Sequence, residues 1–168
     1  MRPRSFGYVV FEGPTLLLDW GVQSFRNGAN AVRIPLATKI TALLEDFRPT
    51  VVVAKEPPSR KKVNRARTRK VLELVRHKAS LRGIRTRVFK RRAASKLFGG
   101  DERVTKYKIA TALAERFAEL RPVLPAKRKP WESEDYRMSV FDAAALGVAY
   151  FDRQNPTPIV PPENLTPS

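Results

Sequence analysis

The sequence predicts a three-layer α/β domain, in which a mixed sheet begins as an antiparallel β-meander and continues in parallel strands with flanking helices. Two observations lead to this fold class. Short apolar runs separated by turn signals open the chain, as in a meander. From about residue 30 onward, stretches of helical periodicity alternate with strand-like runs, as in βαβ units. The 168 residues are enough for one domain with a substantial core. We assign this domain to residues 1–152.

The first 26 residues predict three short strands. An apolar run at residues 8–11 is followed by Glu12-Gly13-Pro14, which is a turn signal, and by a second run at residues 15–20. Gly21 interrupts that run, and residues 22–26 then alternate between apolar and polar side chains. Tight turns between successive strands give antiparallel pairing.

The next stretch predicts two helices, each followed by a strand. Residues 30–47 show helical spacing, with Pro35 suited to a first turn, and residues 50–54 form a β-branched run typical of a buried parallel strand. A second helix is predicted over residues 60–82, basic at its start and apolar on one face later. A strand at residues 84–89 follows it.

The last third predicts helices and loops. Gly99-Gly100-Asp101 reads as a loop, and Thr105 is a suitable N-cap for a helix through residue 117. Residues 121–130 form a proline-rich basic loop, and residues 135–152 form the final helix. The tail, residues 153–168, contains five prolines, and we expect it to be disordered.

The charge of the chain points to a polyanionic partner. Lysine and arginine number 33 against 16 acidic residues, which gives a net charge of +17. Between Lys55 and Lys96 there are 17 basic residues and only two acidic ones, Glu56 and Glu73. Such concentration favours nucleic acid over an acidic membrane surface, because displaced counterions drive binding. A solvated helix face or an assembly surface is the alternative explanation.

Several classes of protein are not expected. The chain contains no cysteine, which excludes disulfides and thiol catalysis, and its one histidine, His77, lies in a stretch typical of an exposed helix. No apolar run approaches the length of about 18 residues that a membrane span requires. We therefore expect a cytoplasmic protein that does not insert into membranes.

Two carboxylates are candidate metal ligands. Glu56 follows the buried strand, where ligands bind in open α/β sheets, although it could instead pair with Lys55 or Arg60. Asp142 lies in an apolar helix, where a carboxylate is costly unless it is paired or bound to metal; a salt bridge to a buried arginine is the alternative. Both groups suit Mg²⁺ or Mn²⁺. Ser139 and Asp135 precede Asp142 on the same helical face, but Asp135 is about 11 Å away along an unbroken helix.

The order of these motifs resembles the RuvC-type Holliday-junction resolvases, which are nucleases of the RNase H-like superfamily. The resemblance rests on Gly7-Tyr8-Val9-Val10, Val51-Val52-Val53-Ala54-Lys55-Glu56-Pro57, Thr105-Lys106 and Asp142-Ala143-Ala144-Ala145-Leu146. It covers residues 4–151. It implies that Glu56 and Asp142 are catalytic metal ligands, and that Lys106 approaches a substrate phosphate rather than being an ordinary exposed lysine.

The sequence departs from the family pattern in two places. Ser139 stands where the resemblance implies another acid or a histidine. The family's first-strand aspartate would fall at or before Met1, and no acid precedes Glu12. We interpret Met1 as an internal or alternative start, with a strand ending in aspartate upstream. An upstream reading frame without such a strand would contradict this hypothesis.

The resemblance and the charge together predict a Mg²⁺-dependent endonuclease for branched or structured DNA, including four-way junctions, with roles in DNA recombination and repair. A non-catalytic nucleic-acid-binding relative and an RNA-processing or ribosome-assembly factor are the alternatives. A homodimer would suit two symmetric cuts, and the apolar half of the second helix is a candidate dimer face. The residues expected to contact nucleic acid, besides Lys106, are Arg60, Lys61, Lys62, Arg65, Arg67, Arg69, Lys70, Arg85, Arg87, Arg91 and Arg92.

Overall fold

The computed structural model describes residues 4–25, 29–57, 62–90, 92–100 and 102–155. The predicted tail therefore lies almost wholly outside the described residues, as do Arg60, Lys61 and Arg91. None of the described helices combines the length and the apolar composition that crossing a bilayer requires.

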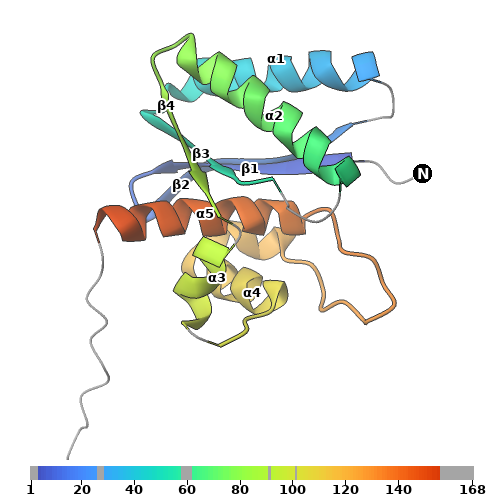
Figure 1. Ribbon diagram of the computed structural model, residues 1–168. Helices are drawn as coiled ribbons and strands as arrows, with labels where there is room; N and C mark the ends of the chain where they lie inside the picture. Colours follow the sequence, from blue (N-terminus) through green and yellow to red (C-terminus); the bar gives the residue numbers. More distant parts are fainter. Residues whose placement is uncertain (1–3, 26–28, 58–61, 91, 101, 156–168) are drawn as a thin grey trace, which may run out of the picture.

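The strands lie between two layers of helices, as Figure 1 shows. One helical layer contains α1 (Ala29–Phe47) and α2 (Lys62–Ser80), and the other is built around α5 (Met138–Gln154). The middle layer holds β1 (Arg4–Glu12), β2 (Leu16–Phe25), β3 (Val51–Lys55) and β4 (Arg85–Phe89). The layer of α5 also holds α3 (Arg92–Gly99), α4 (Lys106–Arg116) and the 3₁₀ helix η1 (Ala118–Val123). The predicted α/β class with three layers is confirmed.

The chain opens with a hairpin of two long strands, so the prediction of three short strands was wrong. β2 continues through Gly21, which pairs with Tyr8 across the antiparallel ladder. The Tyr8 ring lies over Gly21 so closely that a Cβ atom there would collide with it. Glycine at this position therefore makes room for a cross-strand ring instead of ending the strand.

The strands β3 and β4 form a parallel pair with α2 as the crossover, as predicted. Their register runs from Val51 opposite Arg85 to Lys55 opposite Phe89. Among the described strands, β1 pairs only with β2 and β3 pairs only with β4. The middle layer is therefore divided into two halves.

The helices follow the sequence prediction with three differences. Thr105 caps α4 as expected, its side chain accepting a hydrogen bond from the Lys108 amide at 3.2 Å. The short helix α3 was not predicted, η1 lies partly in the predicted loop, and α5 begins at Met138 instead of residue 135. The later start of α5 means that Asp135 precedes the helix.

The main core lies between the β1–β2 hairpin and the helices α3, α4 and α5. Its most buried large side chains are Phe117, Phe141, Leu113, Leu120 and Val140. Helix α5 packs directly on β1, because Gly7 lies against the Ser139 backbone and Gly147 lies against the Phe11 ring. This close packing holds the start of α5, and thus Asp142, against the sheet.

A second cluster lies between α1 and α2 and is centred on Leu36, Ile40 and Leu44. The apolar residues of α2, including Val71 and Val75, pack against this cluster. These α2 side chains are only partly buried by this packing, and the dimer face on α2 remains a prediction.

Candidate active site

Asp142 lies in a small cluster of charged side chains between α5, β3 and α4. Its Oδ2 atom is 3.4 Å from Lys106 Nζ and 4.0 Å from Lys55 Nζ. The side chain keeps 33% of its surface exposed, so substrate can reach it. The alternative of a buried arginine partner is wrong, since Asp142 pairs with two partly exposed lysines. The Asp142 carboxylate, which belongs to α5, thus lies beside the C-terminal end of β3. This is the edge at which α/β sheets bind ligands.

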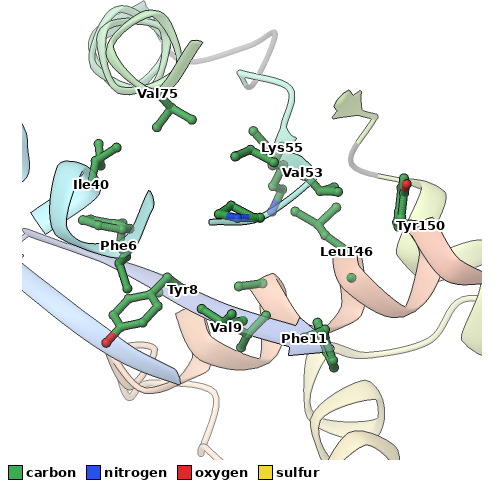
Figure 2. Close-up of a pocket in the computed structure, with 18 of the residues that line it drawn as sticks. Phe6, Tyr8, Val9, Phe11, Ile40, Val53, Lys55, Val75, Leu146 and Tyr150 are labelled. Carbon is green, nitrogen blue, oxygen red and sulfur yellow. The ribbon is translucent and has the colours of Figure 1, made fainter. Parts of the chain in front are cut away.

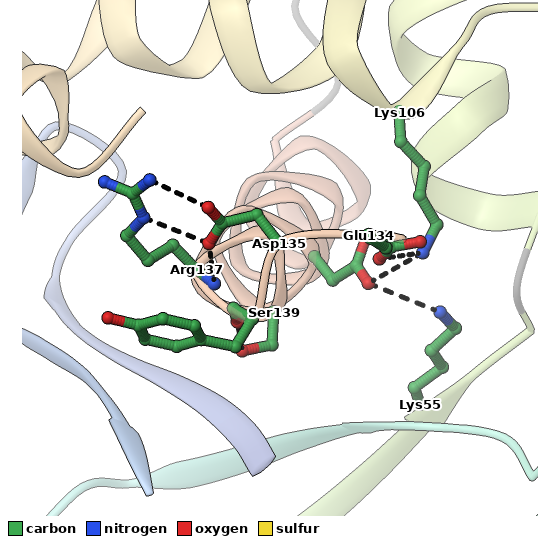
Figure 3. A network of polar contacts seen from close by, with 8 residues as sticks. Lys55, Lys106, Glu134, Asp135, Arg137 and Ser139 are labelled. Carbon is green, nitrogen blue, oxygen red and sulfur yellow. Dashed lines mark hydrogen bonds and ion pairs between the residues drawn. The ribbon is translucent and has the colours of Figure 1, made fainter. Parts of the chain in front are cut away.

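Lys106 is the second centre of this cluster. Its ammonium donates to Glu134 Oε1 at 2.8 Å as well as to Asp142 (Figure 3). Burial acts to lower the pKa of Lys106, but the two carboxylates outweigh it and raise the pKa above its usual value. Lys106 opens α4, where the helix dipole disfavours a cation. The paired carboxylates therefore compensate for an unfavourable position and keep the lysine charged.

Asp135 and Ser139 make other contacts. Asp135 accepts two side-chain hydrogen bonds from Arg137, at 2.7 and 3.0 Å, and a third from the Arg137 amide. These bonds lower the pKa of Asp135, although slight burial opposes them. Figure 3 shows Asp135 turned toward Arg137, away from Lys106. Ser139 Oγ donates to the Tyr136 carbonyl at 2.7 Å. Their assignment as metal ligands remains a prediction.

Glu56 follows β3 directly. Its amide donates to the Phe89 carbonyl at 2.9 Å, which extends the pairing of β3 with β4, and its side chain is exposed. Because successive residues of a strand point to opposite faces, the side chain directed at Asp142 is that of Lys55. Within the described parts of the chain, no group of three or more His, Cys, Asp or Glu side chains could hold a metal ion.

Two cavities meet at Asp142. A cavity of 180 Å³ is lined by Lys106, Ser95 and the start of α5, and a larger one of 460 Å³ extends between β1 and β3 (Figure 2). Asp142, Lys55 and Leu146 line both of them. The charged cluster is therefore accessible from two sides.

The predicted basic residues form an exposed surface where the structure describes them. Exposed side chains belong to Arg65, Arg69, Lys70, Arg85, Arg87 and Arg92. Along β4, Arg85 and Arg87 alternate with more buried residues, as the period of a strand requires. Lys62 and Arg67 lie in α2, but their side chains are not described. Helix α2 contacts both α1 and β4, so the elements that carry most of these residues are neighbours in the fold (Figure 1).

Sequence reasoning missed Lys55 and Glu134. Strand alternation shows that Lys55 and Glu56 face opposite sides, but not which of the two faces α5. Glu134 lies in the stretch before α5, where three acids occur within four residues, at Glu132, Glu134 and Asp135. No local pattern says which of the three approaches Lys106, because that contact joins positions 28 residues apart.

Comparison with known proteins places this geometry in a known fold. One similar structure is Thermus thermophilus RuvC, with a TM-score of 0.64 and 18% identity over 89% of this chain and 88% of that one. The chain has the RuvC fold. A second is T. thermophilus RuvC in complex with a Holliday junction substrate, with a TM-score of 0.61 and 16% identity over 82% of this chain and 80% of that one. No protein-family model and no curated protein matches the sequence. The resemblance inferred from the sequence is thus confirmed at the level of the fold.

Proposed function

We propose that this protein is a RuvC-like endonuclease that binds branched or structured DNA and hydrolyses its phosphodiester bonds with the help of Mg²⁺. The observation that supports it most is the position of the Asp142 carboxylate, which lies beside Lys55 and Lys106 at the C-terminal end of β3 in a RuvC fold. We further propose that it acts in the cytoplasm, in DNA recombination and repair, as a single domain.

Asp142 is the carboxylate that could hold a magnesium ion beside β3. Mg²⁺ is commonly held by one or two carboxylates together with waters and substrate phosphate. Asp142 would supply one carboxylate, and Glu56 could supply a second only by turning from its exposed position on the face opposite to Lys55. The bound ion would polarise the scissile phosphate. A pair of ions would need a further carboxylate. Mn²⁺ prefers the same oxygen ligands.

The lysines have a role that does not depend on the metal. Lys55 and Lys106 balance the charge of Asp142, and the raised pKa of Lys106 keeps its ammonium charged at neutral pH. When a substrate phosphate enters, both ammonium groups can bind it as donors and so release Asp142. The exposed bases of α2 and β4 would contact the remaining phosphates, which positions DNA without reading its sequence.

A second candidate function is DNA binding without cleavage. It is favoured by the pairing of Asp142 with two lysines and by the absence, among the described residues, of a three-ligand cluster. In that case the same surface would recognise branched DNA, and Lys55 and Lys106 would fix Asp142 as a structural group.

A cleavage assay distinguishes the two candidates. The protein is incubated with a four-way DNA junction, duplex DNA or structured RNA, with and without Mg²⁺. We expect Mg²⁺-dependent cleavage of the junction, and we expect Asp142→Asn and Glu56→Gln each to reduce its rate by about two orders of magnitude. The matched control is Asp152→Asn, a carboxylate of the same helix outside the charged cluster.

Each alternative result has a definite meaning. Junction binding without cleavage by the wild-type protein would support the binding function and contradict the enzyme. Preferential binding or cleavage of RNA would contradict a DNA substrate. A cut junction also reports symmetry, because a homodimer would introduce two nicks related by its two-fold axis.

A further inference from the structure

The two tryptophans of the chain have opposite environments. Trp20, on β2, packs against the main core, whereas Trp131 keeps 79% of its surface exposed. Trp131 lies between η1 and α5, in the stretch of residues 124–137 that we call the η1–α5 loop. An indole ring offers one of the largest contact areas of any side chain. The exposed ring is therefore available for an extensive contact with a partner.

The backbone holds Trp131 at the tip of a closed turn. The Glu132 amide donates to the Lys129 carbonyl at 3.0 Å, and the Lys129 amide donates to Glu132 Oε2, also at 3.0 Å. Pro130 occupies the second position of this turn, where its fixed φ is favourable. The turn limits the freedom of the ring before a partner arrives, which reduces the entropy that binding would cost.

Both ends of the η1–α5 loop are attached to the fold. Pro125 is buried at its start, and Glu134 near its end accepts the hydrogen bond from Lys106 at 2.8 Å. Figure 1 shows the loop beside the start of α5. Trp131 precedes Glu134 by three residues, so their backbones are separated by at most about 11 Å. A base at Trp131 would thus lie within about three base steps of a phosphate at Lys106, since each step rises by about 3.4 Å.

The charges of the loop suit a nucleic acid. Lys127, Arg128 and Lys129 directly precede the turn and are exposed, and Lys129 Nζ lies 5.6 Å from the centroid of the Trp131 ring. The three acids of the loop each accept a hydrogen bond within the protein. An exposed aromatic ring among cations is the arrangement that binds unpaired nucleotides, because the ring stacks on a base while the cations contact phosphates.

We propose that Trp131 is a base-binding residue, which stacks its indole ring on an unpaired base at the branch point of DNA bound at Lys106. Lys127, Arg128 and Lys129 contact the phosphates next to that base. This proposal rests on the DNA-binding part of the proposed function and is independent of cleavage. A base inside a duplex must first leave its stacked neighbours, which is costly, whereas an unpaired base at a branch is already free to stack on the ring. Trp131 therefore favours branched DNA over duplex DNA.

Other partners fit this loop less well. An amphipathic membrane anchor needs a wide apolar face, and Trp131 stands between a run of three bases and a run of acidic positions. A tryptophan that dominates a protein interface is usually surrounded by neutral contacts that exclude water. The neighbours of Trp131 are instead charged and solvated.

The test measures binding without Mg²⁺, so that no strand is cut. The probes are a four-way junction, a duplex with one unpaired 2-aminopurine, and the fully paired duplex of the same sequence. Trp131→Ala should weaken binding to the first two probes roughly tenfold or more, and should leave the paired duplex within about twofold of the wild type. Because the ring is uncharged, the steepness of the salt dependence should not change. The wild type should quench the 2-aminopurine fluorescence, and Trp131→Ala should not.

Two further variants identify stacking as the cause. Trp131→Phe keeps an aromatic face and should restore most of the affinity that Trp131→Ala loses. The control Leu81→Ala removes another exposed apolar side chain, 67% exposed in the turn before β4, and should bind all three probes like the wild type. Thermal unfolding transitions confirm that each variant is folded.

Four results would overturn the proposal. Unchanged affinity of Trp131→Ala for the junction would do so while leaving the proposed function intact, and so would an equal loss on the junction and the paired duplex. Affinity as low for Trp131→Phe as for Trp131→Ala would exclude stacking as the cause. If Trp131→Ala lost binding only to vesicles of phosphatidylcholine and phosphatidylserine, the residue would be assigned to a membrane contact. Failure of the wild type to bind any of these DNAs would overturn the proposed function as well.

Discussion

The role that a carboxylate can have in this protein depends on which basic side chains it contacts. Asp135 and Asp142 are both carboxylates near the start of α5, yet their partners differ. Asp135 is held by a bidentate arginine two residues away, whereas Asp142 is shared between two lysines from distant elements. The arginine beside Asp135 in the sequence holds that carboxylate in a local turn. The lysines beside Asp142 are partly exposed, so a phosphate that bound them would free the Asp142 carboxylate. Asp142 is for this reason the better candidate for chemistry.

The Asp135–Arg137 pair leads to a prediction about stability at acid pH. The pKa of Asp135 is lowered in the folded protein, so the pair stabilises the fold above the unfolded pKa of about 3.9, and this contribution disappears as the pH falls through the lower folded value. Asp135→Asn should therefore cost about 0.5 kcal/mol at pH 6 and almost nothing near pH 2, a small effect because both side chains are about one-third exposed.

Urea unfolding of wild type and variant at both pH values measures this difference. The control is Glu132→Gln, measured at the same two pH values, which replaces a neighbouring exposed acid with no arginine partner among the described contacts. A cost for Asp135→Asn that grows toward low pH would contradict the assigned direction of the shift.

At the scale of elements, the position of α5 depends on a close approach to β1. Gly7 lies so near the Ser139 backbone that any side chain there would collide with it. Gly7→Ala should therefore destabilise the fold by about 1–3 kcal/mol, since backbone atoms of a packed helix cannot move aside as a flexible side chain can. Because Asp142 is one turn along the same helix, the variant should also disturb the charged cluster.

Denaturant unfolding tests this prediction against Gly13→Ala. Gly13 has a positive φ of 70° but open space around it, so its replacement should cost only about 1 kcal/mol, from backbone strain alone. Equal costs for the two variants would show that contact between β1 and α5 contributes little to stability.

The same elements explain how much could be predicted from the sequence. The β-branched run of β3, the Thr105 cap and the periodicity of α1 are local signals, and each element formed where its signal lies. Gly21 was misread as a strand end, because glycine is needed there to make room for the Tyr8 ring of the neighbouring strand. The residues adjacent to Gly21 in the sequence do not reveal this contact. Helix α3 is only eight residues long, too short for a clear periodic pattern.

The residues of the candidate site also fall into two groups, those with a local sequence signal and those without one. Asp142 could be found because an acid in an alanine-rich apolar helix is unusual at any position, whatever it contacts. Lys55 and Glu134 could not be assigned, because their roles depend on which elements meet in space. The division of the middle layer into the pairs β1–β2 and β3–β4 is likewise a property of the folded chain, since the sequence of each strand gives no sign of it.

At the scale of the whole molecule, the net charge of +17 should dominate binding to DNA. The exposed bases of α2 and β4 lie on two elements that contact each other, so we expect phosphate contacts to involve them more than basic residues elsewhere. Each phosphate contact releases condensed counterions, and the logarithm of the binding constant then falls with the logarithm of salt by about 0.9 per contact.

Single replacements measure which bases take part. Arg69→Gln on α2 should reduce the steepness of this salt dependence by about one unit and weaken binding to junction and duplex alike, because a phosphate contact carries no sequence information. Arg121→Gln removes the same charge at an exposed position of η1, on the opposite helical layer, and should leave the slope unchanged. The slopes come from binding titrations with a labelled four-way junction at several salt concentrations. If both variants lower the slope equally, the protein attracts DNA through its total charge, and the surface formed by α2 and β4 has no special part in binding.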